Sequence, residues 1–332
     1  MRVKLKSFLM RIIFTIFLCA VFSANIFGQE QETQPIVLIP FGYDFIRLGS
    51  QSIHNPAIGV GFLLGDMDAP FTEVEGRILA LALWRPLFFS QRPHAGVPTA
   101  LHNVEALVDW RIERHQLLLI LNSTADRPLA GGLSTFQAGA GWGYEVIRQR
   151  HISLILGAAL AVGEFDVGDA TLPVLPVPLI RFAVDTQWFN ASFDFLTGPN
   201  LDFTIAPEKR IRFTADMRMD HYRSIIDVIC EFTLWYRLFP SEHRLGDFAG
   251  IGIGFKNDAE DFAITGNQTI ENRASVFEIQ RASLFAVIDL SLLRLEGGWI
   301  FNSRYTFNGQ NAGSPGRGFY LSVQGIIPIG RF

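Results

Sequence analysis

Apolar and polar residues alternate along much of this sequence, and that period of two constrains the fold more than any other feature. Over residues 210–219 every second side chain is apolar: Ile211, Phe213, Ala215, Met217 and Met219. Successive side chains of a β-strand point to opposite faces, whereas an amphipathic helix repeats its apolar positions every three to four residues. The segment is therefore predicted to be a strand with one apolar face and one charged face.

The same alternation recurs in four other segments, at residues 104–112, 180–185, 189–195 and 293–304. In the last of these segments the pattern predicts an apolar row and a polar row. The apolar row is Leu293, Leu295, Trp299 and Phe301, and the polar row is Arg294, Glu296, Asn302 and Arg304. Repeated strand patterns of this kind indicate an all-β chain.

The two faces of these strands favour a membrane barrel over a soluble β-sandwich, which also alternates and stays open as an alternative. Mean hydropathy is +0.24, and the polar faces carry full charges. All six Trp are predicted near strand ends, where barrels place aromatic girdles: Trp84, Trp110, Trp142, Trp188, Trp235 and Trp299. Lipid accepts the apolar face and a wet interior accepts the charges, so we predict a transmembrane antiparallel up-and-down β-barrel.

Residues 1–28 have the composition of a secretory signal peptide. Arg2, Lys4, Lys6 and Arg11 supply positive charge around an apolar body at residues 8–21. Cleavage is expected after Ser23 or near Gly28, and a retained membrane anchor is the competing interpretation. Loss of residues 1–28 leaves 24 Lys+Arg against 32 Asp+Glu, a net charge of −8. Residues 29–35 are predicted to form a short periplasmic lead-in and residues 36–332 the barrel.

Connection lengths predict which rim of the barrel each turn occupies. Tight turns are expected at residues 113–115, 148–150, 206–208 and 290–291, on the periplasmic side with the C-terminus. Longer outer loops are expected at residues 86–99, 123–132, 164–171, 256–268 and 308–316. Both ends on one side require an even strand number, and we expect about 14 strands, with 12 to 16 allowed by the poorly patterned segment 36–75.

Charged residues on the predicted inner faces are the candidates for function. These lumen or constriction candidates are Arg181, Asp185, Arg210, Arg212, Asp216, Arg218, Asp227, Glu231, Arg294 and Glu296. Such residues can pair across the wall as a lattice that fills a closed barrel, or form a constriction that selects solutes by charge. We expect a porin-like passive channel for small solutes, and a plugged structural or surface-binding barrel is the alternative.

Other chemistries have weaker support in the sequence. His151 and Ser153 share a strand face and resemble the His-x-Ser pair of barrel lipid A deacylases, but Leu154 stands where those enzymes often have Asn, and no orienting acid is placed by the sequence. We therefore expect a turn-proximal polar pair and no enzyme. No metal site and no cofactor is predicted, and Asp258, Glu260 and Asp261 are expected in a solvated outer loop. A net charge of −4 without basic stripes argues against nucleic-acid binding.

The leader, the alternating strands and the terminal Phe332 together resemble bacterial outer-membrane β-barrel proteins. Residues 295–304 also look like a strand of barrel families known only as domains of unknown function. The resemblance implies an outer-membrane location, contact with outer-membrane lipid, and recognition of the C-terminal aromatic residue by the barrel-assembly machinery. Phe332 has the opposite parity to Phe319, Leu321 and Val323, so a bulge near Pro328 is needed to restore the phase.

Overall fold

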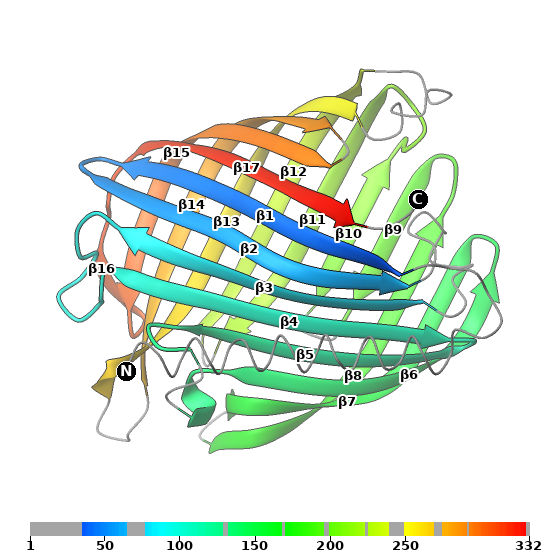
Figure 1. Ribbon diagram of the computed structural model, residues 1–332, viewed down its shortest axis with the longest axis horizontal. Helices are drawn as coiled ribbons and strands as arrows, with labels where there is room; N and C mark the ends of the chain where they lie inside the picture. The colour runs from blue at the N-terminus through cyan, green and yellow to red at the C-terminus, as the bar shows by residue number, and fades with distance from the viewer. Residues whose placement is uncertain are drawn as a thin grey trace.

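The computed structural model describes residues 35–64, 77–128, 132–167, 170–195, 199–222, 225–238, 249–268, 274–290 and 292–329. These residues form one antiparallel sheet of 17 strands that closes on itself (Figure 1). The predicted signal peptide, nearly all of the predicted lead-in and Phe332 lie outside the described residues. A single closed sheet excludes the β-sandwich, which needs two sheets packed face to face.

The strands follow one another around the barrel in chain order. They are β1 (Ile36–Leu48), β2 (Gln51–Leu64), β3 (Ile78–Phe89), β4 (Ala100–Ile112), β5 (His115–Ala125), β6 (Gln137–Gln149), β7 (Ile152–Val167), β8 (Ala170–Asp185), β9 (Phe189–Asp194), β10 (Asn200–Ile205), β11 (Ile211–Tyr222), β12 (Ile225–Arg237), β13 (Ala249–Gln268), β14 (Ala274–Leu290), β15 (Leu293–Phe307), β16 (Gln310–Gly313) and β17 (Gly318–Ile329). A short 3-10 helix, η1 (Gly132–Ser134), lies between β5 and β6.

Closure is made by β1, which pairs with β2 on one side and with β17 on the other. The blue and red strands therefore lie side by side in Figure 1. The four-residue β16 pairs only with β15, so 16 strands form the barrel wall. This even number is at the upper end of the predicted range and exceeds the favoured estimate of about 14. The six-residue β10 and the weak alternation of β1 and β2 account for the difference.

Residue parity separates the two faces of the wall, because residues paired across antiparallel strands share a face. Ile211 on β11 points outward and is 60% exposed. Its neighbour Arg212 points inward, with its guanidinium 5.3 Å from the centroid of the Trp235 ring. Paired registers carry this parity from strand to strand. The predicted separation of an apolar outer row from a charged inner row on this strand is confirmed.

The outer surface is rich in exposed large apolar side chains from strands on every side of the barrel. Examples are Ile58, Trp142, Leu160, Ile253, Leu284, Trp299 and Leu321. An apolar exterior on a closed sheet suits hydrocarbon, because no backbone edge is left unpaired in lipid. Among the described residues there is no helix long and apolar enough to span a membrane.

Several sequence expectations are wrong in detail. Residues 256–268 are part of β13 instead of a loop, because the inward Lys256, Asp258 and Glu260 are paired inside the barrel. A bulge that skips Phe301 shifts the phase of β15. Asn302 and Arg304 therefore point outward instead of inward.

Trp84, Trp142 and Trp299 lie near the middle of β3, β6 and β15 instead of near strand ends. Trp235 departs further from the prediction, because it is not part of an outer aromatic girdle. Its odd position on β12 points the ring inward, where it is only 5% exposed. The facing residue on β13 is Gly252, and a Cβ there would lie 3.0 Å from the Trp235 ring. The glycine leaves the room that the indole occupies.

The division of tight turns and longer connections between the two rims is only partly as predicted. Residues 164–167 and 170–171, which were expected in a long outer loop, belong to β7 and β8, and only two residues join these strands. Two residues also join β1 to β2 and β11 to β12 on the same rim, whereas 13 residues join β2 to β3 on the opposite one. Two residues join β4 to β5 and two join β6 to β7, on the rim where the chain ends at β17. Glu113 supplies the positive φ of the first of these turns, at 52°. The opposite rim carries longer connections, such as residues 90–99 between β3 and β4. We call this second rim the outer mouth.

Candidate functional site

Many charged residues on the inner face are paired: besides the pairs Arg85–Glu105 and Arg148–Glu145, they form three larger groups. The first joins β4 to β8, two strands that are not neighbours in the sheet. Arg181 Nε donates to Asp194 Oδ2 at 2.7 Å, and Arg181 Nη1 lies 3.4 Å from Asp109 Oδ2. Gln116 Nε2 also donates to Asp109 at 2.7 Å, and Arg111 Nε lies 3.8 Å from the same carboxylate. The wall between β4 and β8 is therefore curved sharply enough for its charges to meet.

The second group surrounds Glu296 on β15, whose side chain is 5% exposed. Arg294 Nη2 bridges Glu296, at 2.7 Å, and Glu231 on β12, at 2.9 Å. Lys256 Nζ lies 2.5 Å from Glu296, and Tyr320 Oη donates to the same carboxylate at 2.6 Å. Buried charges are tolerated only when paired and hydrogen-bonded, and Glu296 meets that condition.

The third group is nearer the outer mouth, on β13 and β14. Arg281 Nη2 lies 3.0 Å from Asp258 and 2.9 Å from Glu260. These two acids were expected in a solvated outer loop. Instead, both of them bind a buried arginine. Within the described ranges, no three His, Cys, Asp or Glu residues are placed to hold a metal ion.

The inner face of β9, β10 and β11 differs from the rest because its polar side chains are half-buried or exposed. Asp202 on β10 is paired in register with Asp216 on β11, and Ser192 on β9 donates to Asp202 at 3.2 Å. Arg218, one inward position further along β11, is exposed. We call Ser192, Asp202, Asp216 and Arg218 the accessible strip. Asp216 and Arg218 are exposed, whereas every charged side chain of the three paired groups is buried or half-buried.

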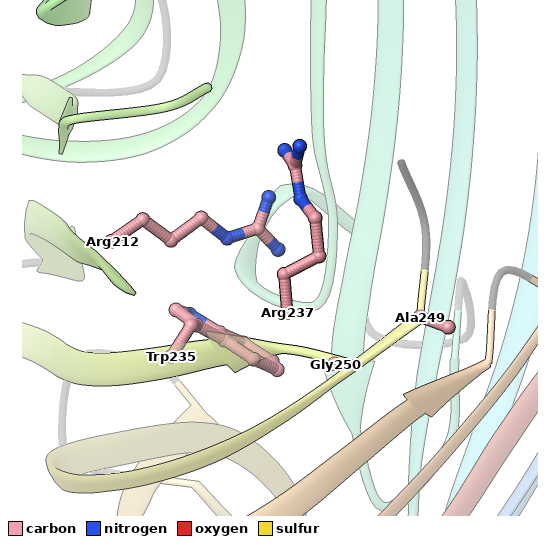
Figure 2. A pocket seen from close by; sticks show the side chains of 5 residues that line it. All are labelled: Arg212, Trp235, Arg237, Ala249 and Gly250. Atoms are coloured by element: carbon pink, nitrogen blue, oxygen red, sulfur yellow. The ribbon is translucent and has the colours of Figure 1, made fainter. Parts of the chain in front are cut away.

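A small recess lies near the periplasmic rim, beside β12 and β13. It is lined by Arg212, Trp235, Arg237, Ala249 and Gly250. Figure 2 shows the guanidinium groups of Arg212 and Arg237 approaching one another above the Trp235 ring. Arg237 Nη2 donates to the Pro207 carbonyl at 3.0 Å. On this part of the wall the positive charge of two arginines is concentrated near the periplasmic rim.

The remaining predicted lumen residues lie at the rims of the barrel, or their side chains are outside the described part of the chain. Asp185 ends β8 at the periplasmic rim, and its backbone N–H donates to the His151 carbonyl at 3.0 Å. Arg210 precedes β11 at the same rim and is exposed. The backbone of Asp227 pairs with Asp220, but its side chain lies outside the described residues. The structure therefore does not bring all ten predicted residues into one ring.

Several inward charges were missed by sequence reasoning, although the signal was present for some of them. Asp109 and Arg111 alternate with outward Val108 and Trp110 in a segment already identified as a strand. Lys256, Asp258 and Glu260 were missed because Asn257 and Asp261 make the other face of β13 polar as well. Arg281 was missed because its partners are on the neighbouring strand β13, and the alternation within one strand does not predict contacts between strands.

His151 and Ser153 do not act on one another. Ser153 Oγ donates to Glu145 Oε1 at 2.7 Å, whereas the His151 ring donates from Nδ1 to the Asp185 carbonyl at 2.7 Å. A nucleophile needs its base within hydrogen-bond reach, with the base oriented by a third group. The two side chains instead tie neighbouring parts of the wall together.

Apolar side chains fill part of the inner face near the outer mouth. Buried residues from β1–β4 meet buried residues from β13–β15 in one cluster, which includes Leu48, Ile53, Leu87, Phe89, Leu101, Phe262, Ile264, Phe277 and Ile279. The rings of Phe89 on β3 and Phe277 on β14 are 6.4 Å apart. We call this set the apolar plug. It closes the space between these strands to water.

The closed wall, its lipid-compatible exterior and its charged interior define an outer-membrane β-barrel. No family model matches the sequence, and the search of curated proteins gave no match. Three solved barrels are similar in fold: Pseudomonas aeruginosa OpdQ (11% identity, TM-score 0.36, covering 90% of this chain and 100% of that one), Acinetobacter baumannii OccAB4 (9%, 0.35, 91% and 100%) and the P. aeruginosa outer membrane protein OprD (10%, 0.31, 90% and 96%). At such scores, the assignment of this fold depends on the strand pairing of the chain itself.

Proposed function

We propose that this protein is a porin-like passive channel for small solutes in the bacterial outer membrane. The accessible strip is the observation that carries the proposal. Its side chains are polar, face inward and remain half-buried or exposed, whereas the outward side chains of the same strands are apolar. A solute path through a bilayer needs a barrel wall with a hydrated, polar inner face and an apolar, lipid-facing outer face.

Charge on the strip supports selection of solutes by charge. Asp202 and Asp216 lie side by side, and Glu231 is the register partner of Asp216 on the next strand. Glu231 is paired with Arg294, so the two aspartates carry most of the negative charge facing the path. Rings and rows of charged side chains set ion preference in pores. Arg218 offsets part of this charge, and Arg212 and Arg237 add positive charge nearer the periplasmic rim.

Planar-bilayer recording of the purified, folded protein tests the proposal. We expect discrete, voltage-independent conductance steps in KCl, and heat-unfolded protein should give none. Absence of conductance at every voltage and salt concentration from several preparations of folded protein would contradict a channel.

A plugged structural or surface-binding barrel is the second candidate, and the apolar plug favours it. A lumen blocked along its whole width would leave only the outer loops for function. In that case the folded barrel would carry no current, and deletion of residues 91–98 between β3 and β4 would remove ligand or cell binding without any change in conductance.

Two further proposals concern export and assembly. Residues 1–28 would direct export and be removed, and Phe332 would be recognised by the barrel-assembly machinery. From Gly318 to Ile329, β17 pairs with β1 without a register shift, so the bulge considered near Pro328 is absent from this part of the strand. Replacement of Phe332 by Ala should lower the yield of folded barrel in cells while leaving refolding in detergent unchanged. Equal yields in cells would contradict this role for Phe332.

A further inference from the structure

The β13–β14 hairpin crosses the outer mouth and pairs with the opposite wall. Ala263 on β13 forms a parallel bridge with Ala125 on β5, and Asp126 N–H donates to the Ala263 carbonyl at 2.9 Å. Seven barrel strands separate β5 from β13 in either direction around the wall. The hairpin therefore reaches from its own place in the sheet to the strand farthest from it; the gold end of β13 is at the left of Figure 1.

Asp126 holds this contact with its side chain. Its Oδ1 accepts from the Thr265 backbone N–H at 2.8 Å, and its Oδ2 accepts from Thr265 Oγ1 at 3.1 Å. A carboxylate that accepts two hydrogen bonds from one residue fixes both the position and the orientation of the hairpin. The small side chains of Ala125, Ala263 and Ala274 pack together at the contact and are nearly unexposed. They allow the two backbones to approach.

Burial shows that the hairpin is enclosed instead of projecting into solvent. Residues 274–279 of β14 are buried at six successive positions, so both faces of the strand are covered. The inward Phe277 and Ile279 belong to the apolar plug. On the other face, Thr306 on β15 donates to buried Glu278 at 2.7 Å.

The hairpin therefore divides the mouth into two unequal parts. On one side, β14, β15, β17 and β1–β4 are closed by the apolar plug. On the other side, β9–β11 carry the accessible strip. Ser322 on β17 and Ser192 on β9 illustrate the difference: both point inward, but Ser322 is 7% exposed and Ser192 is half-buried.

We propose that Asp126 latches the β13–β14 hairpin to β5, and that this closes one part of the outer mouth and confines solutes to a path along β9–β11. The proposal rests on the proposed channel function for its solutes, but the partition itself is a property of the fold. Asp126 acts as a positioning residue, because it sets the mouth through the hairpin and lies away from the accessible strip.

Thiol accessibility tests the partition. In a background with Cys19 and Cys230 replaced by Ser, single variants Ser192→Cys and Ser322→Cys form a matched pair, since both substitute one inward serine. A charged, membrane-impermeant thiol reagent should label Ser192→Cys at least ~10-fold faster in reconstituted vesicles, because buried thiols are inert. It should also lower the conductance of that variant alone. Equal labelling, or faster labelling of Ser322→Cys, overturns the partition.

The latch has its own test. Ser275→Cys reports on the hairpin, where Ser275 is 3% exposed. Adding Asp126→Ala should raise its labelling rate at least ~10-fold by local opening and enlarge the conductance steps. Thr265→Val should act more weakly, since the backbone bond to Asp126 remains. Glu208→Ala, on an exposed periplasmic turn, is the control and should change neither readout. An unchanged labelling rate with Asp126→Ala, or the same rise with Glu208→Ala, overturns the latch.

The two proposals can fail separately. Protection of Ser322→Cys and labelling of Ser192→Cys without any current would support the partition and contradict the channel. Current with both cysteines equally labelled would support the channel and contradict the partition.

Discussion

Arg281 Nη2 lies 3.0 Å from Asp258 Oδ1 on the neighbouring strand, and the arginine side chain is only 8% exposed. Glu260 completes the group at 2.9 Å. Inside the barrel wall, the ionic contacts between the arginine and the two acids compensate for the hydration that these charges lose on burial. The group also lies directly beneath the part of the β13–β14 hairpin that reaches β5, so it stabilises the base from which the hairpin extends.

Replacement of Arg281 by Met should destabilise the barrel by about 3–5 kcal/mol, because it leaves two carboxylates without their cation. The urea midpoint of the shift between folded and unfolded forms on detergent gels measures this loss. Addition of Asp258→Asn and Glu260→Gln to Arg281→Met should restore much of the stability. A triple variant less stable than the single variant would contradict the pairing.

An introduced arginine should lower the stability of the barrel at Leu201 but be tolerated at the neighbouring Asp202 on β10. Leu201 points outward and Asp202 inward, so Leu201→Arg should cost up to about 2–4 kcal/mol, the cost of arginine on the lipid face near the bilayer midplane. Asp202→Arg should be tolerated, because it faces Asp216 in a wet interior. Equilibrium unfolding from lipid vesicles gives both values. Equal losses for the two variants would contradict the orientation of this strand.

Ion preference should depend on the accessible strip. Combined Asp202→Asn and Asp216→Asn should move the reversal potential in a KCl gradient toward anion preference, because negative charge is removed from the path. Arg218→Gln should move it toward cation preference, and Glu208→Gln should leave it unchanged. A shift of the same sign for the strip variants would contradict their place beside the path.

Ser153→Ala should lower stability by about 1–3 kcal/mol, since it removes a buried hydrogen bond to the Glu145 carboxylate. The lipid composition of cells that carry this variant or His151→Ala should match that of cells with the parent protein. Mass spectrometry of extracted lipid A and phospholipids makes the comparison. Loss of one acyl chain with the parent and its retention with both variants would establish a hydrolase instead.

The side-chain period was sufficient to predict the fold class, because few folds accommodate a strand with charges on one face and Ile, Phe and Met on the other. The strand number was harder to predict. β10 has only six residues, and the two polar faces of outer β13 hide its continuation past Phe255. Local alternation cannot identify a strand whose outward face is polar.

The site was predicted less completely than the fold. Inward position follows from parity, so Arg181, Arg212, Asp216 and Arg218 were placed on the correct face. Contacts between strands that are distant in sequence do not follow from parity. Asp109 with Arg181, and Asp126 with Thr265, depend on how sharply the wall curves and where the hairpin bends. Bulges are a further limit, as the reversal of Arg304 shows.

Cysteine labelling along β11 tests the central claim most directly. In the background without native cysteines, Arg212→Cys, Phe213→Cys, Met217→Cys and Arg218→Cys are reconstituted singly in vesicles and exposed to a water-soluble maleimide and to a lipid-soluble one. We expect water-phase labelling at positions 212 and 218, and labelling only from lipid at positions 213 and 217. A reversed pattern, or one without alternation, would contradict a cylinder with hydrocarbon outside and water within.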